Sequence, residues 1–309
     1  MGRNDSVGAS SVAALFGCSP WQSEFSLFAK TVGLAPEQED TGRLSSGRYL
    51  EQAILAEWKK RYDIGNGPDD NYATWMAWND KSVAHKAYPF ITATPDAIGA
   101  QPRWVDGATV DGVSDIIVVD VKTVTRERRA DWNDGVPDYY RLQSQQQQLV
   151  CGAQRGLIIA QFGFEELAHE WIDADEKIQD QICSRIITFW KRVQGELPPP
   201  EADGHRATTE ALARREVTAK AIELGPDIRA LSDDLAGIER LQREFAAEQQ
   251  RLRNKIRSAM GDASVGVFPD SSGWKIRQQV ASEFMVKKKA HTVMARINSK
   301  EAVGDEDAT

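Results

Sequence analysis

The first part of the chain alternates between helical and strand-like spacing of its apolar positions. Residues 10–33 predict a short helix, a Gly-Cys-Ser-Pro turn and a second helix that ends at Gly33. Between Ser46 and Tyr62 apolar side chains recur every three or four residues, which predicts a longer helix. The members of this stripe are Tyr49, Leu50, Ala53, Ile54 and Trp58.

Strand-like runs follow. Residues 82–98 predict a pair of strands, and IIVVDVKT at residues 116–123 predicts the next one. A helix is expected for YYRLQSQQQQLVCG, and strands are expected for RGLIIAQFG and LAHEWIDAD. Residues 175–193 then predict a helix whose apolar stripe consists of Ile178, Ile182, Ile186 and Trp190.

The clearest boundary is GELPPPEADG at residues 195–204, because three prolines cannot continue a helix and the composition turns polar. We therefore expect a core at residues 1–200 and a C-terminal extension at residues 201–309. The extension predicts a long amphipathic helix, a β-hairpin with its turn at 270–273, and a disordered tail. The apolar seam of this helix comprises Leu231, Leu235, Ile238, Leu241, Phe245, Leu252, Ile256 and Met260.

The seam has three candidate partners: a neighbouring subunit, a separate partner protein, or the core of the chain itself. Of these, packing against the chain's own core is the expectation we carry to the structure.

Composition narrows the class of protein. The chain has 309 residues, of which 41% are hydrophobic, so it can bury a sizeable core. No apolar run approaches the 18 or so residues of a membrane span, and residues 1–11 lack the pattern of an export signal. Three separated cysteines and four scattered histidines lack zinc or iron–sulfur spacing. We expect a cytoplasmic protein without a membrane partner.

A charged pair ends the most apolar strand. Asp120 and Lys122 are two residues apart, so their side chains share one face of the strand while Val121 points to the other. Buried charge is costly unless it is paired or bound to a metal. A surface ion pair is the ordinary interpretation of a lone Asp-x-Lys, and only the surrounding sequence can favour another one.

Two further acids stand upstream. Asp96 follows Pro95 at a strand or turn edge, and Glu51 lies on a helix whose other face is apolar. Taken singly, Asp96 is a common turn residue and Glu51 a solvated helix residue. Taken together with Asp120 and Lys122, they suit Mg²⁺, which prefers hard oxygen ligands and retains waters. Such an ion lowers the pKa of bound water for attack on a phosphodiester. The net charge of −8 argues modestly against a protein that coats DNA, but not against a confined DNA site.

This ordered set of acids and lysine resembles the PD-(D/E)xK nuclease superfamily, and within it the phage lambda exonuclease-like, or YqaJ-like, viral recombinases. The matching segments, over roughly residues 3–190, are GASSVAALFGCSPWQS, GRYLEQAI, TATPDAI, VVDVKT and PDYYRLQSQQQQLVCG. The family's Tyr-x-x-Gln-x-Gln helix corresponds to Tyr140, Gln143 and Gln145, and Gly152 ends the pattern. Asp120 replaces a glutamate frequent in the family, and it can still ligate Mg²⁺. The likeness weakens after residue 200.

The resemblance implies an α/β fold with a restriction-endonuclease-like core, in which helices flank a central mixed β-sheet. It also implies Mg²⁺, expected as two ions with Mn²⁺ as a substitute. Asp96, Asp120 and the Val121 carbonyl would be metal ligands, and Glu51 would act through a metal-bound water. Lys122 would position or activate the attacking water. Gln143 would fix the metal site or the scissile phosphate, and Tyr140 would pack beside it.

The resemblance further assigns DNA contacts. Arg3 and Ser10 have the spacing of a family pair that grips a terminal 5′-phosphate, although Arg3 is equally explained as a residue of a frayed terminus. Arg126 and Arg128 are candidates for backbone phosphates, with solvated loop charges as the ordinary alternative. Gln145 and Tyr140 complete the expected DNA-binding set.

By resemblance, the chain is a 5′→3′ exonuclease acting on linear double-stranded DNA with a 5′-phosphate end. It would release mononucleotides and leave a 3′ overhang for a single-strand annealing protein. A ring-shaped homotrimer is likewise implied by resemblance alone. Two alternatives stay open: a sequence- or structure-specific endonuclease of the same superfamily, and a DNA-end-binding module without catalysis.

Overall fold

Five strands, of which the one at residues 75–78 was not predicted, assemble into a mixed sheet. In this computed structural model we describe residues 5–35, 42–66, 74–105, 108–163, 166–215, 221–270 and 272–275. The sheet has the order β2-β5-β6-β7-β8, and only β6 and β7 run parallel. Its strands are β2 (Trp75–Trp78), β5 (Ala97–Val105), β6 (Ala108–Val124), β7 (Arg155–Phe162) and β8 (Glu166–Asp173).

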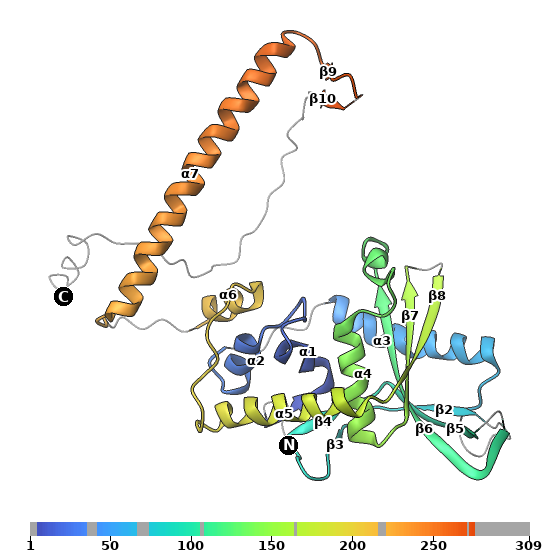
Figure 1. The fold of residues 1–309 in the computed structure, drawn as a ribbon. Helices are drawn as coiled ribbons and strands as arrows, with labels where there is room; N and C mark the ends of the chain where they lie inside the picture. The colour runs from blue at the N-terminus through green and yellow to red at the C-terminus, as the bar shows by residue number, and fades with distance from the viewer. Residues whose placement is uncertain are drawn as a thin grey trace. The chain divides into compact units, whose positions relative to one another are not determined.

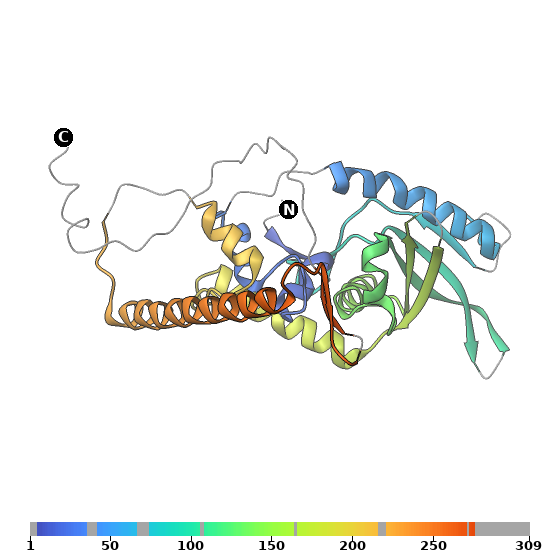
Figure 2. The same ribbon diagram turned by 90° about the horizontal axis from the view of Figure 1, so that it is seen from above.

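Helices cover both faces of this sheet (Figures 1 and 2). Helix α3 (Gly42–Tyr62) packs Ile54, Leu55 and Trp58 on one face, against a cluster that includes Val119 and Val121. Helix α4 (Asp138–Cys151) packs on the other face and ends at Gly152, whose positive φ of 66° suits glycine. The fold class expected from the sequence is confirmed: the fold is α/β, with helices flanking a mixed sheet.

The N-terminal residues pack beside the sheet as a second part of the core. A small sheet of order β1-β4-β3 joins β1 (Val7–Gly8), β4 (Ile91–Ala93) and β3 (Val83–Ala84). One hydrophobic cluster gathers residues from this sheet, α1 (Val12–Leu15), α2 (Glu24–Thr31) and α5 (Glu176–Val193). The expected helix–turn–helix at residues 10–33 is therefore present, preceded by the 3₁₀ turn η2 (Ala9–Ser11).

Proline divides one predicted strand. Residues 91–99 form β4 and the start of β5 instead of one continuous strand, because Pro95 cannot donate to a sheet ladder. Asp96 lies in the resulting turn, where its backbone N–H donates to the Val119 carbonyl at 2.9 Å. The break therefore places Asp96 beside the end of β6.

The first compact unit extends beyond the proline-rich segment, to Arg215. Helix α6 (Arg206–Ala213) packs Ala211 against Phe25 and Ala29 of α2. The buried hydroxyls of Ser23 and Thr208 lie 2.6 Å apart. Our boundary at residue 200 stays a prediction about domain organisation, while α6 packs with the preceding residues.

The second compact unit contains the long helix and the hairpin. Helix α7 (Pro226–Met260) begins at Pro226, and the hairpin pairs β9 (Val265–Val267) with β10 (Gly273–Lys275). None of the residues of α7 is buried, and its Leu235, Phe245 and Leu252 are exposed. The expectation that this apolar seam packs against the chain's own core stays a prediction. No helix in the described ranges combines the length and the apolar character that a bilayer span requires. The predicted disordered tail lies outside the described residues.

Candidate active site

The end of β6 holds the charged pair predicted from the sequence. Asp120 and Lys122 lie on the face of the sheet that α4 covers, and they form an ion pair. Their side chains keep only 3% and 15% exposure respectively, so the pair is desolvated. Strand alternation places the two groups together, as predicted. The ordinary interpretation as a surface ion pair does not apply, because both groups lie inside the unit.

Helix α4 supplies amides to the same carboxylate. Gln143 donates to Asp120 Oδ1 at 2.9 Å, and Gln147 donates to the same oxygen at 3.2 Å. The side-chain oxygen of Gln143, Oε1, in turn accepts a hydrogen bond from Lys122 Nζ at 3.3 Å. Tyr140 completes the arrangement, with Lys122 Nζ 4.9 Å from its ring centroid. Gln143 thus connects the acid and the base, and Tyr140 lies beside them as predicted.

Asp96 approaches from the turn before β5. Its Oδ2 accepts from the Val121 N–H at 2.7 Å, so its carboxylate lies against the backbone between Asp120 and Lys122. Asn79 holds the turn in place, since its backbone N–H donates to the Asp96 carbonyl and its amide donates to the Pro95 carbonyl. The two aspartates therefore reach the same strand end from adjacent strands.

Burial and crowding of charge shift the ionisation of these groups. Burial raises the pKa of Asp96 to about 7, and the charges of Asp120 and Glu51 act in the same direction. Lys122 and the Val121 N–H oppose this rise. Burial by itself would lower the pKa of Lys122, but the charges of Asp120 and Asp96 outweigh it, and the net shift is upward. The site therefore keeps a charged ammonium group next to two acids.

The residues present fit a divalent cation. Asp120 Oδ2 is buried, and apart from the ion pair with Lys122 it has no hydrogen-bond partner among the described residues. Burial, and after it the nearby Asp120 carboxylate, raise the pKa of Asp96, and a bound cation would stabilise its charged form. Within the described ranges no three His, Cys, Asp or Glu side chains form a metal-binding group. A cation here would accordingly rely on the two aspartates, the Val121 carbonyl and water.

A cleft of about 620 Å³ opens beside this strand end. Among the predicted site residues, it is lined by Ser10, Glu51, Val121, Lys122, Arg128, Tyr140 and Gln143. Ser10 is exposed on η2, and Glu51 comes from α3, so the cleft brings together residues from four separate segments. Arg128 follows β6 and donates to the Asp131 carboxylate at 2.9 Å.

Two predicted DNA-binding residues lie away from the cleft, and a third cannot be placed. Gln145 is 3% exposed, its amide donates to the Asp173 carbonyl, and its side-chain oxygen accepts from the Asp175 N–H. These bonds join α4 to the start of α5, so the Gln145 side chain is not accessible to DNA in this structure. Arg126 is exposed near Gly163 and does not line the cleft. Arg3 lies outside the described residues.

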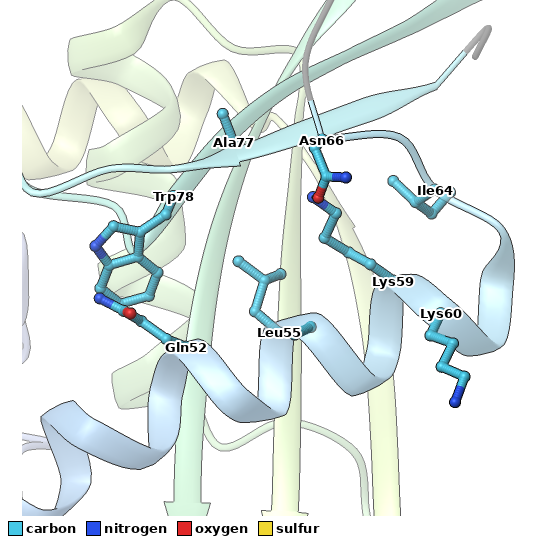
Figure 3. Close-up of a pocket in the computed structure, with 9 residues that line it drawn as sticks. Gln52, Leu55, Lys59, Lys60, Ile64, Asn66, Ala77 and Trp78 are labelled. Atoms are coloured by element: carbon cyan, nitrogen blue, oxygen red, sulfur yellow. The ribbon is translucent and has the colours of Figure 1, made fainter. Parts of the chain in front are cut away.

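A second pocket, of about 550 Å³, lies between α3 and β2 (Figure 3). The buried Lys59 ammonium group donates to Asn66 Oδ1 at 2.8 Å and to the Met76 carbonyl at 2.5 Å. Gln52 and Trp78 form the other side of the pocket (Figure 3). Lys59 fixes the chain that follows α3, and neither aspartate of the charged site lines this pocket.

Sequence reasoning missed several residues of the site. Gln147 follows Gln143 by four positions on a helix, and this spacing alone predicts that both face Asp120. Trp21, Trp132 and Tyr139 add aromatic surface to the cleft. Residues of and beside α6, namely His205, Arg206, Ala207 and Glu210, also line it. No local pattern indicated their role, because α6 meets the cleft only through the tertiary fold.

Comparisons with known proteins give one family match and several similar solved structures. Residues 2–154 match the family model described as the YqaJ-like viral recombinase domain. A search of curated proteins gave no match. Among solved structures, the chain is similar to an alkaline exonuclease from Laribacter hongkongensis, with 16% identity and a TM-score of 0.47 over 63% of this chain and 90% of that one. A phage-related exonuclease from Haemophilus somnus 129PT gives 12% identity and a TM-score of 0.41, over 63% of this chain and 99% of that one.

Proposed function

Because this chain belongs, through residues 2–154, to the YqaJ-like viral recombinase family, we propose that it is a metal-dependent 5′→3′ exonuclease. It resects one strand of linear double-stranded DNA to mononucleotides and leaves a 3′ overhang for annealing recombination. The observation that supports this proposal most is the convergence of Asp96, Asp120 and Lys122 at one strand end beside the cleft.

The chain's own groups have distinct roles in this proposal. Lys122 faces the cleft as an ammonium group and orients the attacking water next to the scissile phosphate. Gln143 holds the Lys122 and Asp120 side chains in register through its two hydrogen bonds. Gln147 fixes the same Asp120 oxygen from the buried side. The geometry is therefore set before substrate binds, which lowers the cost of organising the transition state.

A divalent cation would be held by Asp96, Asp120 and the Val121 carbonyl, with Glu51 nearby through water. When bound, it would supply Lewis-acid polarisation of the phosphate and a lower pKa for water. We propose Mg²⁺ as the resident ion, bound as two ions, with Mn²⁺ as a substitute.

DNA contacts are proposed along the cleft. Ser10 lies on the cleft wall, where a hydroxyl suits the terminal 5′-phosphate for which it was predicted with Arg3. Arg128 presents a guanidinium group to the same cleft, suited to a backbone phosphate. Arg126, which is exposed outside the cleft, is kept as a phosphate contact of longer DNA. A homotrimeric ring around DNA and a single-strand annealing partner are further parts of the proposal.

The decisive experiment incubates the full chain and Mg²⁺ with three matched DNA substrates: a linear duplex with 5′-phosphate ends, the same duplex with 5′-hydroxyl ends, and a closed circle. We expect mononucleotides from the linear duplexes, faster release from the 5′-phosphate, and no reaction with EDTA. Cutting of the closed circle would instead identify an endonuclease. DNA that is bound but left intact would identify a binding module without catalysis.

Active-site variants test the assigned roles in the same assay. Lys122→Ala is expected to lower the cleavage rate about 10²- to 10⁴-fold, because it removes the group that orients water. Lys81→Ala, an exposed lysine away from the cleft, is the matched control and should cleave at the wild-type rate. Equal rates for the two variants, with both proteins folded by circular dichroism, would remove Lys122 from the mechanism.

A further inference from the structure

One large aromatic side chain of the cleft is largely open to solvent. Trp21 is 54% exposed although it lines the same cleft as Lys122 and Gln143. By contrast, Trp58 in the core is 2% exposed. Exposed apolar surface is common in proteins, but here it lies within the concave site proposed to hold DNA. Its place in the cleft is therefore the feature that needs a function.

The local structure holds the Trp21 ring in a fixed position. Ser19 Oγ accepts from the backbone N–H groups of Trp21 and Gln22 at 3.3 and 3.1 Å, which forms a tight turn. The ring lies 5.0 Å from that of Tyr139, edge to face at 81°. The Arg128 guanidinium carbon lies 5.1 Å from the Trp21 ring centroid. Aromatic and cation–π contacts thus hold the ring without covering more than half of it.

We propose that Trp21 is a stacking site for a nucleobase, within a few nucleotides of the phosphate that is cleaved. This inference rests on the proposed nuclease function. Every nucleobase has a flat π-face, so an exposed indole binds DNA bases without sequence preference. The adjacent Arg128 adds a positive charge suited to the phosphate of the same nucleotide.

The position of the site relative to Lys122 supports this assignment. Tyr140 connects the two, with its ring centroid 6.0 Å from that of Trp21 and 4.9 Å from Lys122 Nζ. Successive nucleotides of a B-form strand advance about 3.4 Å along the axis, so this span corresponds to a few nucleotides at most. A base stacked on Trp21 would therefore fix the position of the phosphate beside Lys122. Trp21 is in this sense a substrate-binding residue that sets the register of cleavage.

A double-mutant cycle between protein and DNA tests the stacking directly. Wild type and Trp21→Ala are compared, under single turnover, on a 5′-phosphorylated duplex that is intact or carries one abasic nucleotide at the first, second or tenth position. On intact DNA we expect Trp21→Ala to raise the half-saturating protein concentration roughly 5- to 100-fold. An abasic nucleotide at the first or second position should raise the half-saturating concentration of wild type by a similar factor. It should leave the half-saturating concentration of Trp21→Ala unchanged. The tenth position should affect neither protein.

Two further variants control for folding and for surface effects. Trp21→Phe keeps an aromatic face and should retain most of the wild-type activity. Trp78→Ala removes a tryptophan that is 38% exposed and lines the other pocket, and it should behave as wild type.

The outcomes separate the stacking site from the proposed function. Two outcomes would overturn the stacking site while leaving the nuclease intact. One is that Trp21→Ala cleaves intact DNA as wild type does. The other is that the effects of Trp21→Ala and of the abasic nucleotide on the half-saturating concentration are independent, so that their factors multiply. A wild-type protein that neither cleaves nor binds any of the duplexes would overturn the proposed function and this inference with it. Binding without cleavage would overturn catalysis alone, and the same cycle run on dissociation constants would then decide the role of Trp21.

Discussion

Helix α4 contains four consecutive glutamines and buries all of them, whereas helix α7 has an apolar seam and buries none of its residues. In α4 each glutamine bonds to a different part of the fold. Gln145 bonds to the start of α5, Gln146 to the Val7 and Thr92 carbonyls, Gln147 to Asp120, and Gln148 to Ser144 and the Ile172 carbonyl. In α7, taken within its own compact unit, none of the side chains is buried.

The difference shows that a side chain is buried when the fold offers it packing or hydrogen-bond partners, and that its polarity alone does not decide this. An amide can enter a core when its donors meet backbone carbonyls, because the hydrogen bonds compensate for lost water. The glutamine run therefore connects three layers of the fold and also orients the carboxylate of the proposed active site. An apolar seam, in turn, is buried only where another surface meets it.

The largest contrast should come from matched leucine truncations. Leu157→Ala in β7 removes a side chain with 0% exposure and is expected to cost about 2–5 kcal/mol of unfolding free energy. Leu235→Ala in α7, which is 44% exposed, should cost less than about 0.5 kcal/mol. Urea unfolding followed by circular dichroism measures both. A large loss for Leu235→Ala would mean that the seam is covered in solution.

Matched glutamine truncations give the next largest contrast. Gln146→Ala leaves the buried carbonyls of Val7 and Thr92 without their donor, and we expect a loss of about 2–4 kcal/mol in the free energy of unfolding. Gln242→Ala on the exposed surface of α7 should be almost neutral. Similar urea midpoints for the two variants would contradict the idea that the glutamine run holds the fold together.

Gln147 tests the link between the buried amides and the proposed chemistry. Gln147→Leu preserves volume but removes one of the two amide donors to Asp120 Oδ1, and we expect cleavage about 10- to 100-fold slower. Gln148→Leu alters a neighbouring buried glutamine that does not touch Asp120. The comparison uses the cleavage rate per folded molecule. If Gln148→Leu slows cleavage equally, the effect of both variants is structural only.

The smallest expected effect concerns His169. Partial desolvation beside the rings of Trp58 and Tyr62 lowers the pKa of His169, which stays exposed, so the unfolded chain binds the proton more readily than the folded one. Stability should therefore fall as the pH drops below the unfolded value of about 6.5. When the pH is lowered from 7.5 to 5.5, the melting temperature of wild type should fall slightly more than that of His169→Gln. An identical loss for both proteins would show that His169 does not contribute.

Much of the fold was predictable because it depends on local periodicity. The helices α3, α5 and α7 and the strands β6 to β8 follow from apolar spacing, and alternation along β6 places Asp120 and Lys122 on one face. The charged site was predictable in part for the same reason. Strand alternation places Asp120 and Lys122 together, and Asp96 joins them because the strand that follows it pairs with β6. The assigned chemical roles of these residues stay predictions.

What the sequence did not reveal depends on contacts between distant segments. Gln145 belongs to the same motif as Gln143, yet it lies two positions further along the helix, so its side chain points toward α5 and away from the cleft. Trp21 follows a turn that fits many surface loops, and only the fold places it opposite Tyr139. No spacing rule covers such encounters, because they are fixed by how whole helices pack.

The packing of α6 against α2 matters for anyone who shortens this protein for assay or crystallisation. The Ser23–Thr208 contact and the His205 contact with the Ser19 carbonyl hold α6 next to the turn that carries Trp21. A fragment that stops at residue 200 would lack His205, Arg206 and Glu210 and with them one wall of the cleft. A fragment that runs to Arg215 keeps that wall and omits residues 216–309, so it is the better design for isolating the candidate site.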